Sequence, residues 1–418
     1  MTQTSTEQKA SEKNRRAESS DFSPLTRLSE RAPSRIECIR IYHLQSPMPE
    51  IMIMAHARRT HWYATLVQVV DNHGTEGWGE CLGPPELILP ILEHYYAPLL
   101  IGKDPFSFSG IWDTIWRDSF WWARRGALLS AMSGLDMALW DLSGHATGRS
   151  LSEMLGTRHR ERLPCYATGL YFKERPETEY VNSMVDEALH YVEQGYRAVK
   201  CQLGRNLYSD RALVRNLRAA LPDTPLIGDA CCAYDLPEAA QIGAALEDAG
   251  FVWFEDPISV EHPEQYARLA QQLRLPLAAG EWEQTRWGFQ KLLTPGGVSL
   301  PQIKLHYCGG LTEALRIRSL IHSAGLNLSP VADGTMLNIA ASVHFLASDI
   351  RQQNRADFTM GLLGMVASAD PIRDNVFNPG IRVEGGIAYV PTGPGLGVQV
   401  DQDELRFFKG HFAEVTAP

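Results

Sequence analysis

The chain has 418 residues, 44% of them hydrophobic, and a formal net charge of −10 at pH 7. This length and apolar content suffice for two domains that share one compact unit. The negative charge argues against a general nucleic-acid-binding protein, and no apolar run reaches the length of a membrane-spanning helix. No charged segment followed by an apolar run opens the chain, so we expect no secretory signal and a cytoplasmic location.

The N-terminal third divides into a tail and a domain. Residues 1–33 are rich in Ser, Thr, Glu, Lys and Arg and lack apolar periodicity, which predicts a disordered tail. Residues 34–160 then carry strand patterns followed by helix patterns, which predicts an α+β capping domain. The expected strands cover 36–42, 63–70 and 77–80, and the expected helices cover about 86–99, 105–118 and 125–146. Residues 46–56, between the first two strands, are expected to form a loop.

Residues 161–385 repeat a strand followed by a helix, which predicts a parallel barrel of the (β/α)7β type, a modified TIM barrel. The expected strands cover 163–168, 196–204, three runs that each end in an acidic residue, 298–305, 328–332 and 358–363. The expected helices include 209–218, 236–247, 263–273, 311–324 and 336–347. Residues 386–418 are expected to return to the cap, together with a hairpin at 381–391.

Three acidic residues mark the barrel strands. Asp229, Glu255 and Glu281 each close a short apolar run, and they are separated by equal intervals of 26 residues. Because the carboxyl ends of barrel strands form one functional face, the three carboxylates are expected to converge. Their mutual repulsion requires a cation, and an oxygen-only ligand set favours Mg²⁺. The alternative is that each acid only caps the helix that follows it.

The residues around these acids carry a resemblance to a known family. The segments Lys200-Cys-Gln-Leu-Gly, Asp229-Ala, Glu255-Asp-Pro, Gly280-Glu281 and Lys304-Leu-His-Tyr-Cys-Gly-Gly resemble successive strand ends of the enolase superfamily. The similarity is greatest to its mandelate racemase and muconate-lactonizing branch, and it extends from about residue 35 to the C-terminus. The motif Tyr166-Ala-Thr-Gly-Leu-Tyr resembles members that act on sugar acids and lactones, such as sugar-acid dehydratases and lactone cycloisomerases.

This resemblance implies a magnesium-dependent lyase or isomerase acting on a small-molecule carboxylate. The α-proton of the substrate would be removed to give an enediolate, followed by β-elimination or cycloisomerisation. Asp229, Glu255 and Glu281 would bind the metal, Lys200 would stabilise the enolate, and Lys304 would be the base. A neighbouring metal and a second Lys would disfavour the charged form of Lys304, so we expect its pKa to be lowered. The alternative is that Lys304 is only a solvated or salt-bridged residue. The resemblance also implies a homo-oligomer.

The sequence departs from the family pattern at four positions. Gln202 stands where the second Lys of a Lys-x-Lys motif is usual, and Lys304 stands where racemase-like members have an Asp. Val331 occupies the position of a His, and Gly364 that of an acid on the eighth strand. Two-base racemisation is therefore not expected. These losses leave a second hypothesis open: a pseudoenzyme that keeps the metal cage as a binding or assembly subunit.

Other residues near these positions are candidates for substrate binding. Gln202 can hydrogen-bond a substrate, and His306 and Asp333 lie close in sequence to the missing Asp–His pair. In the resembled family the segment corresponding to 46–56 closes over the active site, which makes His56 a candidate together with Met48, Met52 and Met54. Ordinary packing is the alternative for these side chains.

Overall fold

The computed structural model describes residues 33–352, 363–366 and 369–417. The predicted tail, residues 1–33, lies outside the described residues except for its last position. Most of the predicted eighth strand, 358–363, also lies outside them. Among the described helices, none combines the length and apolar character that a membrane crossing requires.

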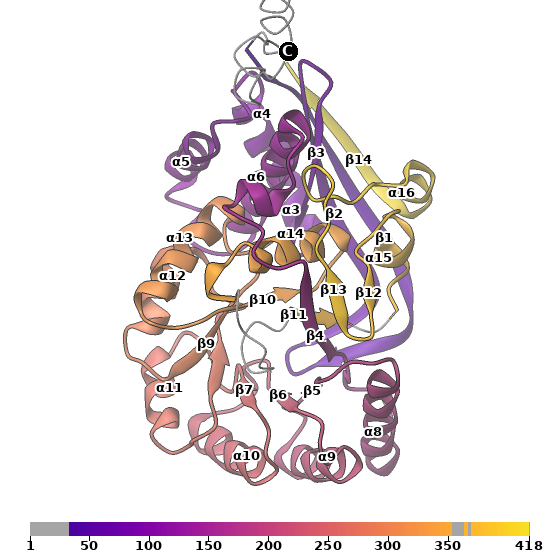
Figure 1. The fold of residues 1–418 in the computed structure, drawn as a ribbon, viewed down its shortest axis with the longest axis vertical. Coiled ribbons are helices and arrows are strands. Elements are labelled where there is room, and N and C mark those ends of the chain that lie inside the picture. Colours follow the sequence, from indigo (N-terminus) through magenta and orange to yellow (C-terminus); the bar gives the residue numbers. More distant parts are fainter. Residues whose placement is uncertain (1–32, 353–362, 367–368, 418) are drawn as a thin grey trace, which may run out of the picture.

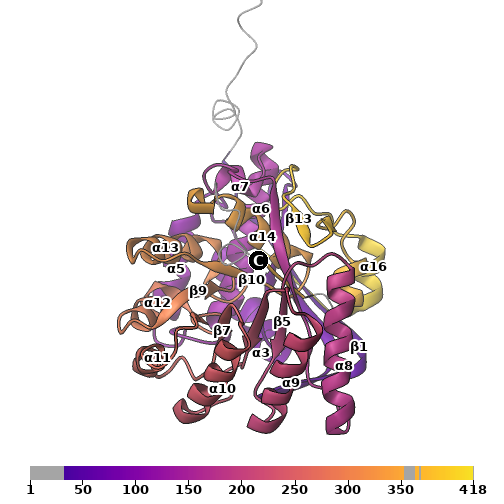
Figure 2. The ribbon, with the colours of Figure 1, turned by 60° about the horizontal axis from the view of Figure 1, so that its bottom comes forward.

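The larger part of the chain is an α/β barrel (Figures 1 and 2). Its parallel strands are β4 (Arg162–Thr168), β5 (Val199–Gln202), β6 (Leu226–Asp229), β7 (Trp253–Glu255), β8 (Leu277–Ala279), β9 (Val298–Ile303), β10 (Ser329–Ala332) and β11 (Leu363–Val366). Each strand pairs with the next, and β11 also pairs in parallel with β4. The ring of strands is therefore closed.

A helix follows each barrel strand from β4 to β10, which confirms the predicted (β/α)7β order. These helices are α8 (Glu177–Glu193), α9 (Leu207–Ala220), α10 (Leu236–Asp248), α11 (Pro263–Ala270), α12 (Thr285–Leu293), α13 (Gly310–Ser323) and α14 (Met336–Ala347). Local signals set their starts: Asp235 and Glu238 form a capping box at α10. The hydroxyl of Thr335 accepts a hydrogen bond from the Leu337 N–H at the start of α14.

The cap is an antiparallel sheet covered by helices. Its strands, in the spatial order β14-β1-β2-β3, are β14 (Lys409–Thr416), β1 (Ile36–Met54), β2 (Ala57–Asp71) and β3 (Glu76–Cys81). Its helical elements are α3 (Pro85–Ile91), the π-helix η1 (Leu92–Tyr96), α4 (Ala97–Leu100), α5 (Phe108–Ser119) and α6 (Ala127–Thr147). Helix α6 approaches β3 so closely that a Cβ on Gly79 would lie 2.0 Å from the Gly134 carbonyl oxygen. Only glycine fits there.

Short elements complete the chain. They are α7 (Leu151–Met154), η2 (Ile350–Gln352), α15 (Pro371–Asn375), β12 (Val383–Glu384), β13 (Ile387–Tyr389) and α16 (Gln402–Phe408). The predicted hairpin at 381–391 forms, but its expected return to the cap is wrong, because β13 pairs with the barrel strand β4. The segment that returns to the cap is β14, which pairs with β1. In Figure 1 it runs beside the first strands of the chain.

The prediction of a loop at 46–56 is also wrong. Strand β1 continues to Met54 and pairs with the start of β2, after an interruption of the register between Pro47 and Met52. Beyond the prolines, Ile and Met occupy successive positions, and such apolar side chains are compatible with a partly buried strand. The hairpin tip reaches the barrel, where Ile53 exchanges two backbone hydrogen bonds with Phe172.

Candidate active site

The three predicted acids lie at the carboxyl ends of adjacent barrel strands. Asp229 is the last residue of β6, Glu255 is the last residue of β7, and Glu281 follows β8 by two positions. Asp229 and Glu255 are paired residues in the register of their strands. All three side chains are buried. The parallel topology therefore gathers them at one end of the barrel, as the sequence predicts.

Lys200, on β5, forms ion pairs with two of these acids. Its Nζ lies 2.9 Å from Asp229 Oδ2 and also contacts Glu255 Oε1. Burial by itself lowers the pKa of Lys200, but the Asp229 and Glu255 carboxylates outweigh it and raise this pKa above its usual value. Burial in turn raises the pKa of Glu255. Lys200 is therefore held as a cation against the acid cluster.

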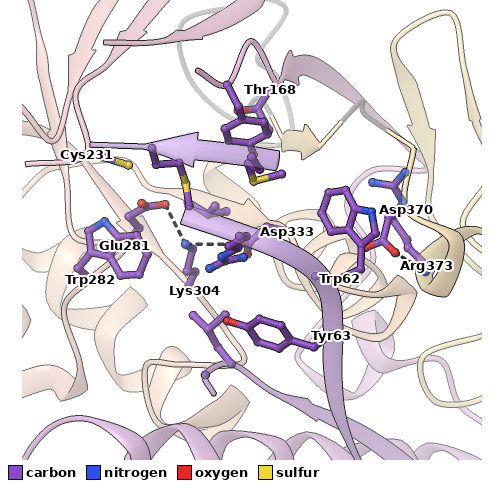
Figure 3. A pocket seen from close by; sticks show the side chains of 18 of the residues that line it. Trp62, Tyr63, Thr168, Cys231, Glu281, Trp282, Lys304, Asp333, Asp370 and Arg373 are labelled. Carbon is purple, nitrogen blue, oxygen red and sulfur yellow. Dashed lines mark hydrogen bonds and ion pairs between the residues drawn. The ribbon is translucent and has the colours of Figure 1, made fainter. Parts of the chain in front are cut away.

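Lys304, immediately after β9, connects the third acid to Asp333. Its Nζ lies 3.2 Å from Glu281 Oε2 and 3.1 Å from Asp333 Oδ2, and 4.1 Å from the centre of the Trp282 ring (Figure 3). Burial lowers the pKa of Lys304, but Asp333 and Glu281 raise it by more. The lowering expected beside a bound metal stays a prediction, because one of the two carboxylates that raise this pKa is Glu281, an expected metal ligand.

A cavity opens above these groups, with walls from both domains. The barrel contributes Lys200, Gln202, Asp229, Cys231, Glu281, Lys304, Val331 and Asp333, and the cap contributes Met52, Met54, Arg59, His61, Trp62, Tyr63 and Glu80. In the view of Figure 3, Trp282 and Cys231 lie on one side of Lys304 and Trp62, Asp370 and Arg373 on the other. The strand extension of β1 and β2 thus forms the cap side of the cavity.

Glu80, on β3, is a residue of this cavity that the sequence reasoning did not assign. Its carboxylate accepts hydrogen bonds from the Thr335 N–H at 3.0 Å, the Thr335 hydroxyl at 2.7 Å and the Asn338 N–H at 3.3 Å. Burial raises the pKa of Glu80 to about 7. A cap carboxylate therefore fixes the start of α14 and the loop that carries Asp333. The Gly77-Trp-Gly-Glu segment was visible in the sequence, but nothing local identified its distant partners.

The predicted substrate-binding residues occupy different places. Gln202 and Asp333 line the cavity, and the Gln202 amide donates a hydrogen bond of 3.0 Å to the Asp229 carbonyl. His306 is fully buried, and its Nε2 lies 3.6 Å from Asp333 Oδ1. Burial lowers the pKa of His306 to about 4. His56 is exposed, lies outside the walls of this cavity, and has its Nε2 3.1 Å from the Cys232 carbonyl oxygen.

Comparison with known proteins agrees with this fold and site. The model described as "Mandelate racemase / muconate lactonizing enzyme, N-terminal domain" matches residues 38–156, and the model described as "Enolase C-terminal domain-like" matches residues 183–404. The chain belongs to this branch of the enolase superfamily. The expected enolase-superfamily fold, with its cap and its barrel, is confirmed.

The similarity to relatives in this superfamily covers most of the chain. D-galactarolactone cycloisomerase of Agrobacterium fabrum is 32% identical over 369 residues, which cover 88% of this chain and 96% of the relative. Arabinonate dehydratase of Saccharolobus solfataricus is 28% identical over 83% of this chain and 90% of its own length. The crystal structure of the 3,6-anhydro-D-galactonate cycloisomerase from Zobellia galactanivorans has a TM-score of 0.81 at 30% identity and covers 90% of this chain and all of that one.

Enolase-superfamily members bind a divalent metal, and the residues present here fit one. Asp256, next to Glu255, is buried, and neither of its carboxylate oxygens has a hydrogen-bond partner among the described residues. Burial and the charges of Glu281 and Asp229 raise its pKa. The cluster therefore places four carboxyl groups beside the two ammonium groups of Lys200 and Lys304, and a bound cation would favour the ionised form of Asp256. The donors of the cluster are all oxygen, as hard cations require.

The acids are not arranged around a common point in this structure. Within the described ranges, no three His, Cys, Asp or Glu side chains stand close enough together to hold a metal. The Lys200 ammonium contacts Asp229 and Glu255, while the Lys304 ammonium contacts Glu281. The two ammonium groups thus supply the positive charge that these carboxylates need, and metal binding requires the acid side chains to turn toward a shared centre.

Proposed function

We propose that the protein is a magnesium-dependent lyase or isomerase that removes the α-proton of a sugar acid or a related lactone. The observation that carries this proposal is the convergence of Asp229, Glu255 and Glu281 with Lys200 and Lys304 beneath a cavity that the cap closes. The relatives named as sugar-acid dehydratases and lactone cycloisomerases support the same reaction class. They give no support to a non-catalytic role.

Five side chains divide three roles between them in the proposed reaction. Asp229, Glu255 and Glu281 hold the cation, which when bound supplies positive charge at the substrate carboxylate. Lys200, fixed beside two of these acids, adds positive charge where negative charge develops as the α-proton leaves. Lys304, next to Asp333 on the other side of the cluster, would receive that proton in its neutral form, which is favoured once Glu281 is engaged by the cation and no longer pairs with the Lys304 ammonium group.

The loss of the usual second base determines the outcome of the reaction. Gln202 and Val331, which both line the cavity, have no side chain that can return a proton to the opposite face of the substrate. Departure of a β-substituent, or ring rearrangement, then follows proton removal. This favours a dehydratase or a cycloisomerase over a racemase, in agreement with the names of the relatives. The cytoplasmic location, the homo-oligomeric state and the domain boundaries stay predictions.

The test is proton exchange in deuterated water. The magnesium-loaded protein is incubated with sugar acids and lactones, and exchange of the α-proton and product formation are followed by NMR. We expect Lys304→Ala to reduce the rate by roughly 10²–10⁴-fold, as for loss of a general base. Val331→Ala, in the same cavity, is the control and retains the rate of the parent. Full activity in Lys304→Ala would exclude Lys304 as the base, and no exchange with any substrate, with Mg²⁺ shown to be bound, would favour a non-catalytic role.

A further inference from the structure

We propose that Glu80, a carboxylate of the cap, is a positioning residue for Lys304, the base of the proposed reaction. No described contact joins these two side chains directly, and the residues between β10 and the first turn of α14 connect them. The proposal rests on the proposed function, because it takes Lys304 as the group that receives the α-proton. It adds a residue of the cap to the groups that set the rate of proton removal.

The Glu80 side chain reaches from the cap sheet to the start of α14. Its two carboxylate oxygens each lie 3.0 Å from the Thr335 backbone nitrogen, and Oε2 also accepts hydrogen bonds from the Thr335 hydroxyl at 2.7 Å and from the Asn338 N–H at 3.3 Å. A Cβ on Gly334 would lie 2.4 Å from Glu80 Oε1, so the carboxylate packs directly against this glycine. Backbone N–H groups at the start of a helix have no partner inside the helix, and Glu80 supplies one from another domain. The position of residues 334–338 therefore depends on Glu80.

The same segment holds Asp333 against Lys304. The Asn338 side-chain amide donates a hydrogen bond of 2.8 Å to the Asp333 carbonyl. Asn338 therefore binds Glu80 through its backbone and Asp333 through its side chain. Asp333 in turn places its Oδ2 3.1 Å from Lys304 Nζ. A displacement of the turn that Glu80 holds is therefore passed to the carboxylate that contacts Lys304.

Asp333 is the carboxylate beside Lys304 that is not a proposed metal ligand. The other one is Glu281, at 3.2 Å, which is assigned to the cation. The Trp282 ring, with its centre 4.1 Å from Nζ, limits movement of the Lys304 side chain on a further side. Proton removal requires the base and the α-carbon to meet within a narrow range of distance and direction, and a misplacement of about 1 Å can lower the rate roughly 10²-fold. Asp333 can therefore align Lys304 independently of the metal.

A second buried acid of the cap provides a matched comparison. Asp136, on α6, accepts a hydrogen bond of 2.8 Å from the Thr312 N–H at the start of α13. This contact has the same form as that of Glu80, since a cap carboxylate binds the N-terminal end of a barrel helix. Asp136 does not line the cavity, and no described contact joins Thr312 to the Lys304 side chain. Loss of the Asp136 carboxylate therefore removes a similar bond without the connection to Lys304.

The first experiment measures α-proton removal by Glu80→Gln, which keeps the size of the side chain but replaces one acceptor oxygen by an amide nitrogen that only donates. The magnesium-loaded full-length protein is assayed with galactonate, arabinonate and their lactones. We expect Glu80→Gln to lower kcat by roughly 10–100-fold and to change KM by less than about twofold, because the base is misplaced while the acid cluster is intact. Asp136→Asn is the matched control and should retain the kcat of the parent. Thermal melting confirms that each variant is folded.

The route through Lys304 is tested by combining substitutions. In a Lys304→Ala background, Glu80→Gln should lower the residual rate by less than about twofold, because no amine is left to be placed. Thr335→Val removes the hydroxyl that Glu80 binds and should reproduce part of the loss, whereas Thr335→Ser keeps this hydroxyl and should retain the parent rate. If Glu80→Gln does not fold, Thr335→Val takes its place in every comparison.

An NMR signal of Lys304 gives a measurement that does not depend on turnover. Because its Nζ lies 4.1 Å from the centre of the Trp282 ring, the ring current makes the signal of the adjacent Cε sensitive to the position of the side chain. In protein labelled with ¹³C at the lysine Cε, Lys304→Met identifies this signal. We expect Glu80→Gln to move the Lys304 signal, with a chelator and with Mg²⁺, and to leave the Lys200 signal in place. Asp136→Asn should move neither.

The outcomes separate this proposal from the proposed function. Equal losses from Glu80→Gln in the parent and in the Lys304→Ala background overturn the positioning role, and so does a Lys304 signal that stays in place. A parent-like kcat in Glu80→Gln, with activity lost in Lys304→Ala, overturns the positioning role and leaves the proposed function standing. A Lys304 signal that moves, in a protein that turns over none of the four probes, upholds the link between Glu80 and Lys304 and contradicts the proposed function instead.

Discussion

The buried carboxylates of the cap and those of the barrel differ in the groups that they contact. In the cap, Asp136 accepts a hydrogen bond from the Thr312 N–H, and Asp141 accepts hydrogen bonds from the Trp78 and Leu396 N–H groups. In the barrel, Asp229, Glu255 and Glu281 contact lysine ammonium groups, and Asp229 Oδ1 also accepts a hydrogen bond of 3.0 Å from the Cys231 N–H. Backbone donors fix a carboxylate in one place, whereas ammonium groups and cations can exchange. Contact with lysine therefore distinguishes the three proposed metal ligands from the two cap acids.

The strongest test removes the ammonium group that pairs with two of the barrel acids. Lys200→Met leaves Asp229 and Glu255 buried without their cation, and we expect the metal-free protein to lose roughly 3–5 kcal/mol of its free energy of unfolding. Chemical denaturation measures this loss, and added Mg²⁺ should reduce it. The surface control is Arg58→Met, which breaks an exposed pair and is expected to cost about 1 kcal/mol or less. An equal loss of unfolding free energy in the two variants would show that the Lys200 pairs in the barrel contribute no more to stability than an exposed ion pair.

A second test asks which acids bind the metal. At a Mg²⁺ concentration about 100 times its dissociation constant, binding stabilises the folded state by about 2.7 kcal/mol, which raises the melting temperature. We expect Glu281→Gln to abolish most of this increase and Asp136→Asn to retain it. Melting curves with Mg²⁺ and with a chelator give the comparison. A Mg²⁺-dependent increase that survives in Glu281→Gln would remove this residue from the metal site.

A third test measures the pH dependence of stability that a buried carboxyl group of the cap causes. Burial raises the pKa of Asp136 to about 7. A carboxyl group with a raised pKa in the folded state stabilises that state most below its unfolded pKa, and this stabilisation is lost as the pH rises through the folded value. Asn imitates the protonated form at every pH. Between about pH 4 and pH 7, the parent should therefore lose about 3 kcal/mol relative to Asp136→Asn. A constant difference across this range would show that Asp136 is already ionised.

The sequence predicted the barrel because each strand and helix has its own local pattern. Equal spacing placed Asp229, Glu255 and Glu281 at strand ends without any knowledge of their contacts. The contacts of Glu80 and Asp333 could not be predicted in this way. Glu80 binds Thr335, which lies 255 positions away, and the Asp333 carboxylate lies 3.1 Å from Lys304 Nζ and raises the pKa of Lys304. Such contacts depend on how the two domains pack together.

The side of the cavity that the cap forms shows a second limit of prediction from the sequence. Treating 46–56 as a loop gave no basis for choosing which side chains point inward. Once β1 and β2 are seen to continue as a hairpin, alternation along β2 separates Arg58 from Arg59. The same hairpin leaves His56 outside the cavity walls, although the sequence made it a candidate. The prolines in the segment concealed the strand, because proline usually ends such patterns.

The pairing of β14 with β1 affects how the protein is made. Cys38 lies opposite Thr416, so one edge of the cap sheet is completed only when almost the whole chain has been synthesised. Until then the β1 edge exposes unpaired backbone groups while the barrel between the two strands is still emerging from the ribosome. Pairing over such a long separation slows folding. A chain that ends before residue 409 would leave this edge permanently open to pairing with another chain.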